Sequence, residues 1–370
     1  MKRGKLGGIA AKIAPWAIIV GLYGLAQIEL TPVGEPVQIP PIGERDRYYG
    51  VQTPEPGIIW MVGNGGKIIR SEDDGVSWVV QKTETDLNLM AIATWDKDHA
   101  VVVGNTGVIL VTSDGGETWV EKESEKSKIA NKLIRVRVVP NTDMAIAVGS
   151  LGRVLLTKDR GETWEQQYRY YDRSFFEERF TDLAGGVRRV NQDVIRRGRF
   201  ERDISFYDVA ILSECEWMIT GEYGYVNQTK DCGYNWLETR PAYDTINSMK
   251  FRDKDHGVLV GGSGTILITS DGGETWEQLE AEGVPISHLY DVEWVEQDQT
   301  WLATGEGGVI VKSDASAETW TASRIDPAKS PWFVDIQPMA GKIYVCGEDA
   351  GILTVASGEW VELPRPETHF

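Results

Sequence analysis

Short apolar runs of strand length recur along the chain, and turn-forming residues separate them. The runs alternate between apolar and polar positions, which is the period of a half-buried strand rather than of a helix. The first run of each set has the same character, and examples are LMAIATW from Leu89, IRVRVVP from Ile134, INSMKF from Ile246, LYDVEWV from Leu289 and FVDIQP from Phe333. The pattern predicts an all-β chain.

A Gly-x-x-Gly sequence between two apolar runs follows each of these strands. The copies are MVGNGGKII from Met61, VVGNTGVIL from Val102, AVGSLGRVL from Ala147, ITGEYGYVN from Ile219, LVGGSGTIL from Leu259, ATGEGGVIV from Ala303 and VCGEDAGIL from Val345, the last with one extra residue. Glycines in a two-residue turn between alternating strands predict a β-hairpin.

Tryptophan recurs at an interval that suggests one structural repeat each time, at positions 78, 119, 164, 236, 276, 320 and 360. A period of about 40 residues is typical of propeller blades. Turns precede the tryptophans, with the sequences SEDDGVSW, TSDGGETW, TKDRGETW, TKDCGYNW, TSDGGETW, SDASAETW and the degenerate VASGEW. The sixth copy lacks the glycine.

Each residue type in this turn has a structural use. The aspartate can accept backbone N–H groups inside the turn, and its copies are Asp73, Asp114, Asp159, Asp231 and Asp271. The glycine two residues later permits positive φ, and the tryptophan fills the gap to a neighbouring sheet. Strand, turn, strand, Gly turn, strand, Asp turn, strand is one four-stranded propeller blade. Seven copies predict a seven-bladed β-propeller with antiparallel blades over residues 45–370.

The aspartate turn resembles the Asp-box, also called the bacterial neuraminidase repeat. Seven blades with this combination resemble the photosystem II assembly and stability factor family and its relatives in non-photosynthetic bacteria, over roughly residues 45–363. The resemblance implies a non-enzymatic protein that helps to assemble or stabilise large membrane complexes. Some relatives accompany membrane transporters of the resistance-nodulation-division type, which implies such a transporter as a specific partner.

The N-terminus predicts attachment to a membrane. Lys2, Arg3, Lys5 and Lys12 flank an uncharged apolar run that starts at Ile13. We expect residues 1–30 to be an uncleaved signal anchor that crosses the bacterial inner membrane once through residues 13–30, with the propeller in the periplasm. A cleaved secretory signal is the alternative. Residues 31–44, rich in Pro and Gly, predict an extended tether.

The interval between Trp164 and Trp236 is longer than any other, because residues 166–203 are inserted between blades three and four. The insertion has nine arginines and no lysine, and we expect it to form two short helices on the same face as the Gly-x-x-Gly turns. Loops on rigid scaffolds carry function, and arginine favours carboxylate or phosphate partners. The predicted partner-binding residues are Arg173, Arg179, Arg188, Arg189, Arg196, Arg197, Arg199, Phe176 and Phe180. Packing of the aromatics on the propeller is the alternative.

Composition narrows the functions further. The net charge of −18 argues against a nucleic-acid-binding protein. The four histidines are scattered and there is no CxxC pair, so we expect neither a metal nor a cofactor. A disulfide between Cys215 and Cys232 is one interpretation of two turns on one face, and two free thiols are the other. Cys346 lies in a strand, where we expect a core residue.

Two other functions remain open from the sequence. Asp-boxes occur in sialidases, so a glycoside hydrolase is one alternative, although box residues lie away from such a catalytic centre. A polysaccharide-binding propeller is the other, with exposed aromatics such as Trp95, Trp217, Trp294 and Trp332. We predict no catalytic residues and no small-molecule substrate. Closure of the ring by a strand after Trp360 or by residues before Tyr48 also stays open.

Overall fold

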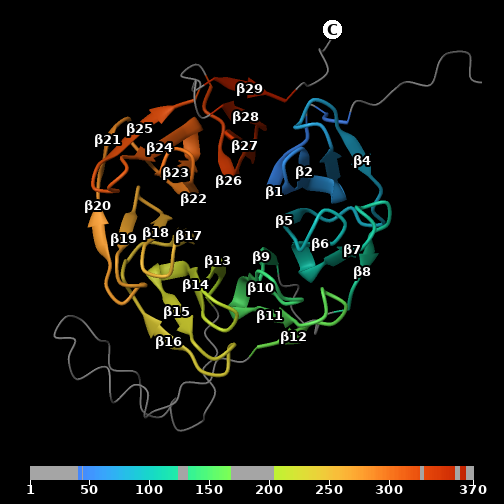
Figure 1. The fold of residues 1–370 in the computed structure, drawn as a ribbon, viewed down its shortest axis with the longest axis horizontal. Coiled ribbons are helices and arrows are strands. Elements are labelled where there is room, and N and C mark those ends of the chain that lie inside the picture. The colour runs from blue at the N-terminus through green and yellow to red at the C-terminus, as the bar shows by residue number, and fades with distance from the viewer. Residues whose placement is uncertain are drawn as a thin grey trace, which may run out of the picture. The chain divides into compact units, whose positions relative to one another are not determined.

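The chain divides into two units, Met1–Pro40 and Pro41–Phe370. The computed structural model describes residues 41–43, 45–123, 132–167, 204–325, 329–354 and 359–363, all in the second unit. There, seven sheets follow one another around a ring (Figure 1). The predicted seven-bladed propeller is therefore confirmed.

Each blade is a meander whose first strand is innermost. Blades one to three consist of β1 (Tyr48–Glu55), β2 (Ile58–Gly63), β3 (Ile68–Ser71), β4 (Val79–Gln81), β5 (Leu89–Thr94), β6 (Ala100–Gly104), β7 (Ile109–Thr112), β8 (Val120–Glu121), β9 (Leu133–Val138), β10 (Ala145–Gly149), β11 (Val154–Thr157) and β12 (Glu165–Gln166). Blades four and five consist of β13 (Phe206–Ile211), β14 (Trp217–Gly221), β15 (Val226–Thr229), β16 (Leu237–Thr239), β17 (Ile246–Phe251), β18 (Gly257–Gly261), β19 (Ile266–Thr269) and β20 (Glu277–Leu279).

Blade six departs from the predicted four strands. Its meander is β22 (Leu289–Val295), β23 (Thr300–Gly305), β24 (Val309–Ser313) and β25 (Trp320–Arg324). A fifth strand, β21 (Ala281–Gly283), pairs in parallel with the outer strand β25. The connection that leaves blade five thus extends the edge of blade six before the chain turns inward. Blade seven has four strands, β26 (Phe333–Met339), β27 (Lys342–Gly347), β28 (Gly351–Thr354) and β29 (Trp360–Glu362).

The Gly-x-x-Gly hairpins form as predicted. In blade one the two central turn residues, Gly65 and Gly66, both have positive φ, and the N–H of Lys67 donates to the carbonyl of Asn64. The first glycine is required for a different reason. A Cβ on Gly63 would lie 2.0 Å from the carbonyl oxygen of Arg47, because that carbonyl approaches to accept the N–H of Asn64. The same approach recurs at the first glycine of the other six turns.

The core lies between blades, where box tryptophans fill the gaps. Trp236 of blade four is almost fully buried and packs with Val148 and Leu156 of blade three. Trp164 packs with Val111 of blade two in the same way. This repeated packing of one blade on the previous one holds the ring together and confirms the predicted role of the tryptophan.

The ring closes without strand exchange among the described residues. Blade seven completes its own sheet with β29, which begins at Trp360. Ile42 and Leu363, from opposite ends of the described chain, lie in one apolar cluster with Tyr48 and Tyr344. Side-chain packing at the junction of blades one and seven therefore contributes to closure.

Several sequence predictions concern residues outside the described ranges. These are the membrane anchor over residues 1–30, the tether apart from its last few residues, and the helices of the insertion 166–203 beyond Gln167. Within the residues that the structure describes, no helix has the length and apolar character needed to span a membrane. The helical parts of the predicted fold stay predictions.

Candidate functional site

One position of the innermost strands places charged residues at the centre of the ring. It is the third residue of each first strand and follows a local irregularity in pairing, for example between Phe206 and Asp208. The seven blades place there, in order, Gly50, Ala91, Arg135, Asp208, Ser248, Asp291 and Asp335. The four longest polar side chains of this set are almost fully buried. Such residues require partners, since an unpaired buried charge is strongly unfavourable.

Each of the three carboxylates connects its own blade to the next one by accepting a backbone N–H of that next blade. Asp208 Oδ2 accepts the N–H of Met249 at 3.1 Å, and Asp291 Oδ2 accepts the N–H of Ile336 at 2.9 Å. Asp335 Oδ2 accepts the N–H of Val51 at 2.7 Å and so links blade seven to blade one. The carboxylates therefore satisfy N–H groups of inner strands that have no neighbouring strand on that side.

Arg135 is the counter-ion for all three carboxylates. Its Nη1 donates to Asp335 Oδ1 at 2.7 Å, and its Nη2 and Nε lie 3.6 Å from Asp291 Oδ1 and 3.4 Å from Asp208 Oδ1. Ser248 contributes a hydroxyl 2.7 Å from Asp291 Oδ1 and 2.9 Å from Asp208 Oδ2. One guanidinium from blade three thus contacts blades four, six and seven.

A second layer of charges lies two residues further along the same strands. Arg137 Nη2 is 3.2 Å from Asp208 Oδ1, and Lys250 Nζ is 2.7 Å from Glu293 Oε2. Gln52 donates to Gln337 at 3.1 Å across the junction between blades one and seven. We name Arg135, Arg137, Asp208, Ser248, Lys250, Asp291, Glu293 and Asp335 the central ion network.

The environment of the central ion network shifts its pKa values in opposite directions. Burial, followed by the negative charge of Asp335, raises the pKa of Asp291 to about 7. Burial also opposes ionisation of Asp208, but Arg137 and Arg135 outweigh it and lower its pKa. Burial raises the pKa of Glu293 against the pull of Lys250 and Arg137. Burial thus favours the protonated form of Asp291 and Glu293, while the two arginines favour the ionised form of Asp208.

Sequence reasoning missed this network. The signal was an Asp at the same place in three first strands, FYDV, LYDV and FVDI, against an Arg in LIRV. The pairing of strands far apart in the chain could not be read from the sequence. Only the closed ring brings the four side chains together.

The Asp-boxes have the predicted geometry and lie away from the centre. In blade three, Asp159 Oδ1 accepts the N–H of Thr163 at 2.9 Å and Oδ2 accepts its hydroxyl at 2.6 Å. Gly161 has φ of 85° and its carbonyl accepts Trp164 Nε1–H at 3.0 Å. Asp73, Asp114, Asp231 and Asp271 make the corresponding bonds. These bonds hold the turn between the third and fourth strands of each blade.

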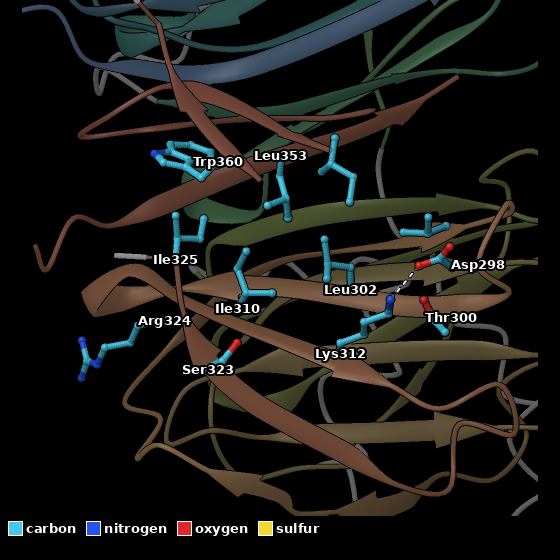
Figure 2. Close-up of a pocket in the computed structure, with 12 residues that line it drawn as sticks. Asp298, Thr300, Leu302, Ile310, Lys312, Ser323, Arg324, Ile325, Leu353 and Trp360 are labelled. Carbon is cyan, nitrogen blue, oxygen red and sulfur yellow. Dashed lines mark hydrogen bonds and ion pairs between the residues drawn. The ribbon is translucent and has the colours of Figure 1, made fainter. Parts of the chain in front are cut away.

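The sixth and seventh Asp-boxes depart from the repeat sequence, and their structures differ. In the sixth, Asp314 accepts the N–H of Glu318 at 3.1 Å, and Ala317 adopts φ of 61° where the first five copies have glycine. In the seventh, Trp360 lies over Gly351 of its own blade, since a Cβ there would be 2.6 Å from the indole. A cavity of about 250 Å³ lies between blades six and seven, lined by residues that include Leu302 of blade six and Leu353 of blade seven (Figure 2).

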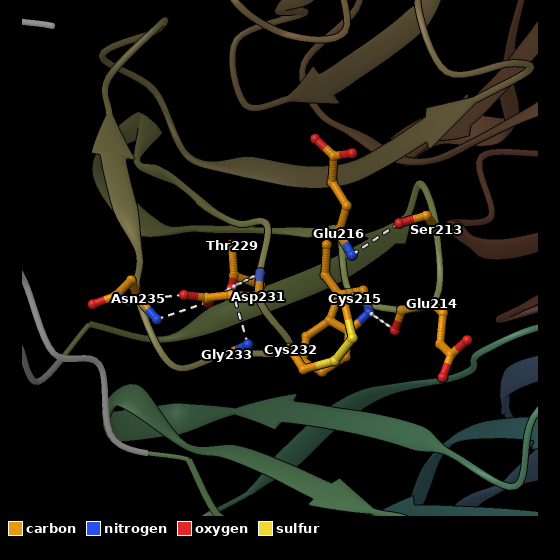
Figure 3. Close-up of a disulfide and its surroundings, with 10 residues drawn as sticks. Ser213, Glu214, Cys215, Glu216, Thr229, Asp231, Cys232, Gly233 and Asn235 are labelled. Carbon is orange, nitrogen blue, oxygen red and sulfur yellow. Dashed lines mark hydrogen bonds between the residues drawn. A yellow bond between two sulfur atoms is a disulfide. The ribbon is translucent and has the colours of Figure 1, made fainter. Parts of the chain in front are cut away.

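Cys215 and Cys232 form a disulfide in blade four (Figure 3). It joins the turn between β13 and β14 to the Asp-box, with the two Cα atoms 4.1 Å apart. The backbones already meet there, because the N–H of Cys232 donates to the carbonyl of Cys215 at 3.0 Å. Arg160 and Asp143 make the same connection in blade three as an ion pair. Cys346 is a buried core residue, as expected.

The predicted docking residues of the insertion lie outside the described residues, but both flanks are fixed. Gln167 donates its N–H to Val154, and Ile204 accepts the N–H of Gly152, each at 2.8 Å. The N–H of Ser205 donates to Glu222 at 2.9 Å. Gly152 and Glu222 belong to Gly-x-x-Gly turns, so the chain leaves and re-enters the propeller on the predicted face.

Two further predictions can be compared with the described residues. Among these residues, no group of three or more His, Cys, Asp and Glu has an arrangement that could hold a metal ion. Of the aromatics considered for polysaccharide binding, Trp217 is fully buried between blades three and four, so that assignment was wrong. Trp332 is half-buried and stacks on Tyr49 at 5.9 Å.

Comparisons with known proteins agree with the resemblance inferred from the repeats. A family model described as photosynthesis system II assembly factor YCF48 matches residues 76–169. No curated protein matches. Among solved structures, YCF48 bound to D1 peptide has 16% identity and a TM-score of 0.60, covering 82% of this chain and 91% of that chain.

Two other solved structures show how widely this fold is shared. YCF48 from Cyanidioschyzon merolae has 17% identity and a TM-score of 0.62, covering 83% of this chain and 94% of that chain. An ancestral GH74 enzyme has 11% identity and a TM-score of 0.63, covering 90% of this chain and 47% of that chain. At these identities the similarity establishes the fold alone.

Proposed function

We propose that this protein is a non-enzymatic scaffold that assembles, stabilises or serves as an accessory subunit of a membrane protein complex. A resistance-nodulation-division type transporter is one candidate complex. The N-terminal anchor would hold the propeller on the periplasmic side of a bacterial inner membrane. The match of residues 76–169 to the YCF48 family model supports an assembly role. One structural neighbour is YCF48 bound to a D1 peptide, which supports a protein ligand.

The observation that carries the proposal is the attachment of the insertion. Both of its flanks are hydrogen-bonded to the Gly-x-x-Gly turns of blades three and four. An arginine-rich segment is thereby presented from a rigid ring, which is the arrangement that suits a docking element. The disulfide of blade four lies in the blade that receives the segment and suits an oxidising compartment.

The central ion network favours a structural role for the carboxylates that a hydrolase would need. Asp208, Asp291 and Asp335 each contact Arg135, and each accepts a backbone N–H from another residue of the inner strands. Carboxylates in these contacts stabilise the ring. We therefore favour a scaffold over a sialidase-like glycoside hydrolase or a polysaccharide-binding propeller.

A pull-down from membranes in mild detergent tests the proposal. The wild-type chain is compared with a variant in which Arg188, Arg189, Arg196 and Arg197 are replaced by Ala. The matched control replaces four exposed lysines of the propeller by Ala, at Lys82, Lys158, Lys230 and Lys254. We expect one membrane complex to co-purify with the wild type and the control and to be lost from the arginine variant. Recovery of glycans in place of a protein would contradict the proposal.

A further inference from the structure

We propose that the outer edge of blade one, formed by β4, binds an extended segment of a partner protein as an additional parallel strand. The inference rests on the proposed function only in requiring a protein partner, and it names a surface distinct from the insertion. Val76, Val79 and Val80 are 79%, 67% and 49% exposed at this edge. Val76 lies in the turn before β4, and Val79 and Val80 are successive residues of β4, so each face of this edge carries one exposed valine of the strand.

Blades two to six carry mostly polar residues at the same positions of the repeat. In place of Val76 they have Glu117, Glu162, Tyr234, Glu274 and Glu318. In place of Val80 they have Glu121, Gln166, Glu238, Gln278 and Ala322. Charged side chains on an edge strand prevent pairing with other chains. Blade one has an uncharged valine at both positions, and Val80, which lies in the edge strand, is a residue type that favours strands.

Blade six has the uncharged Ala322 at the position of Val80, and it shows what such an edge of this propeller binds. Its outer strand β25 pairs in parallel with β21, in the register Ala281 with Trp320, Glu282 with Thr321 and Gly283 with Ala322. The N–H of Val284 then donates to the carbonyl of Ala322. The box tryptophan and the two residues after it are thus the pairing site. The same three positions of blade one are Trp78, Val79 and Val80.

The chemistry of this edge defines the ligand. A strand added in parallel forms backbone hydrogen bonds with β4 and places alternate side chains beside the valines. Apolar, uncharged side chains suit those positions, because a charge against Val79 or Val80 would lose water without gaining a partner. The ligand is therefore an extended segment with alternating apolar residues, comparable to β21 in length. A second copy of this chain is the competing occupant.

Photo-crosslinking followed by peptide binding tests the inference. Benzoylphenylalanine replaces Lys82, an exposed residue directly after β4, in the full chain expressed in its native membrane. The crosslinked segment is sequenced and then synthesised as a peptide. We expect this peptide to bind the full chain in detergent and to slow hydrogen exchange of residues 78–82. The variant V76E/V80E should weaken binding about tenfold or more, because it restores the charges of other blades.

The V76E/V80E variant should fold, since glutamate occupies the same exposed positions in blade two. The matched control is Val361→Glu, at an exposed position of the outer strand of blade seven, and it should leave peptide binding unchanged. The inference would be overturned by a crosslink to a second copy of the chain or by the absence of any crosslink. It would also be overturned if the peptide slowed hydrogen exchange only outside residues 78–82, or if V76E/V80E bound the peptide as well as the wild type. Loss of the membrane complex from the arginine variant tests the proposed function separately, since that variant leaves β4 intact.

Discussion

Arg135 Nη1 donates to Asp335 Oδ1 at 2.7 Å, although the two residues are 200 positions apart in the chain. The contact joins β9 of blade three to β26 of blade seven across the centre of the ring. Asp335 in turn accepts the N–H of Val51 in blade one. The first, third and last blades are therefore connected through one carboxylate, and the closed ring is the condition for this contact.

Replacement of Arg135 by Met should destabilise the protein by about 3–5 kcal/mol, because it leaves three buried aspartates without their shared cation. Urea unfolding followed by tryptophan fluorescence measures the loss. The control is Arg160→Met, which removes a half-buried arginine from Asp143 and should cost less than about 1 kcal/mol. Similar losses for the two variants would contradict the role given to Arg135.

Stability should decrease as the pH rises toward 7, and Asp291 should be a main cause. Its pKa is raised from 3.8 to about 7 in the folded protein, so the folded state binds a proton that the unfolded state releases. The stabilisation is complete below about pH 4 and is lost as the pH rises through about 7. The variant Asp291→Asn cannot ionise there. Its stability, measured by urea unfolding from about pH 4 to about pH 8, should depend less on pH than that of the wild type.

The charged groups around Asp291 are the same in the wild type and the variant, so the comparison isolates the contribution of Asp291 to the pH dependence of stability. Asp335, Asp208, Arg135 and Arg137 face the same carboxyl group and remain in the variant. The pKa of Asp208 is lowered, so its own contribution changes only in acid, below the range of the test. An unchanged slope in Asp291→Asn would therefore show that another group takes up the proton.

The repeat was readable from the sequence because its signals are local. Turn glycines, the box aspartates and the tryptophans lie within one blade, and their spacing alone predicts the hairpins. The central ion network was not readable, since Arg135 and Asp335 meet only when blade three and blade seven face each other. The pairing of β21 with β25 was missed for a related reason. Ala281–Gly283 has no strand-like sequence, and only the neighbouring edge makes it a strand.

Removal of one box carboxylate tests the local part of the fold. Asp159→Ala removes the acceptor of the Thr163 N–H and hydroxyl and should cost about 1–3 kcal/mol. Asp159→Asn keeps one acceptor oxygen and should cost less. Burial opposes ionisation of Asp159, but the Thr163 bonds outweigh it and lower the pKa. The difference in stability between wild type and Asp159→Ala should therefore narrow as the pH falls below 3.8. A constant difference would contradict this origin.

The disulfide should contribute to the stability of blade four. It closes a loop of 17 positions, and loops of that size correspond to about 3 kcal/mol from restriction of the unfolded chain. Thermal unfolding with and without dithiothreitol, at a fixed pH, measures the change. Cys215→Ser combined with Cys232→Ser should lower the melting temperature to that of the reduced wild type and should abolish the effect of dithiothreitol. Cys346→Ala is the control, since it removes the buried thiol and leaves the disulfide, and it should keep the response to dithiothreitol. If the reduced and oxidised wild type unfold at the same temperature, the backbone bond between Cys232 and Cys215 is enough to hold this turn without the disulfide.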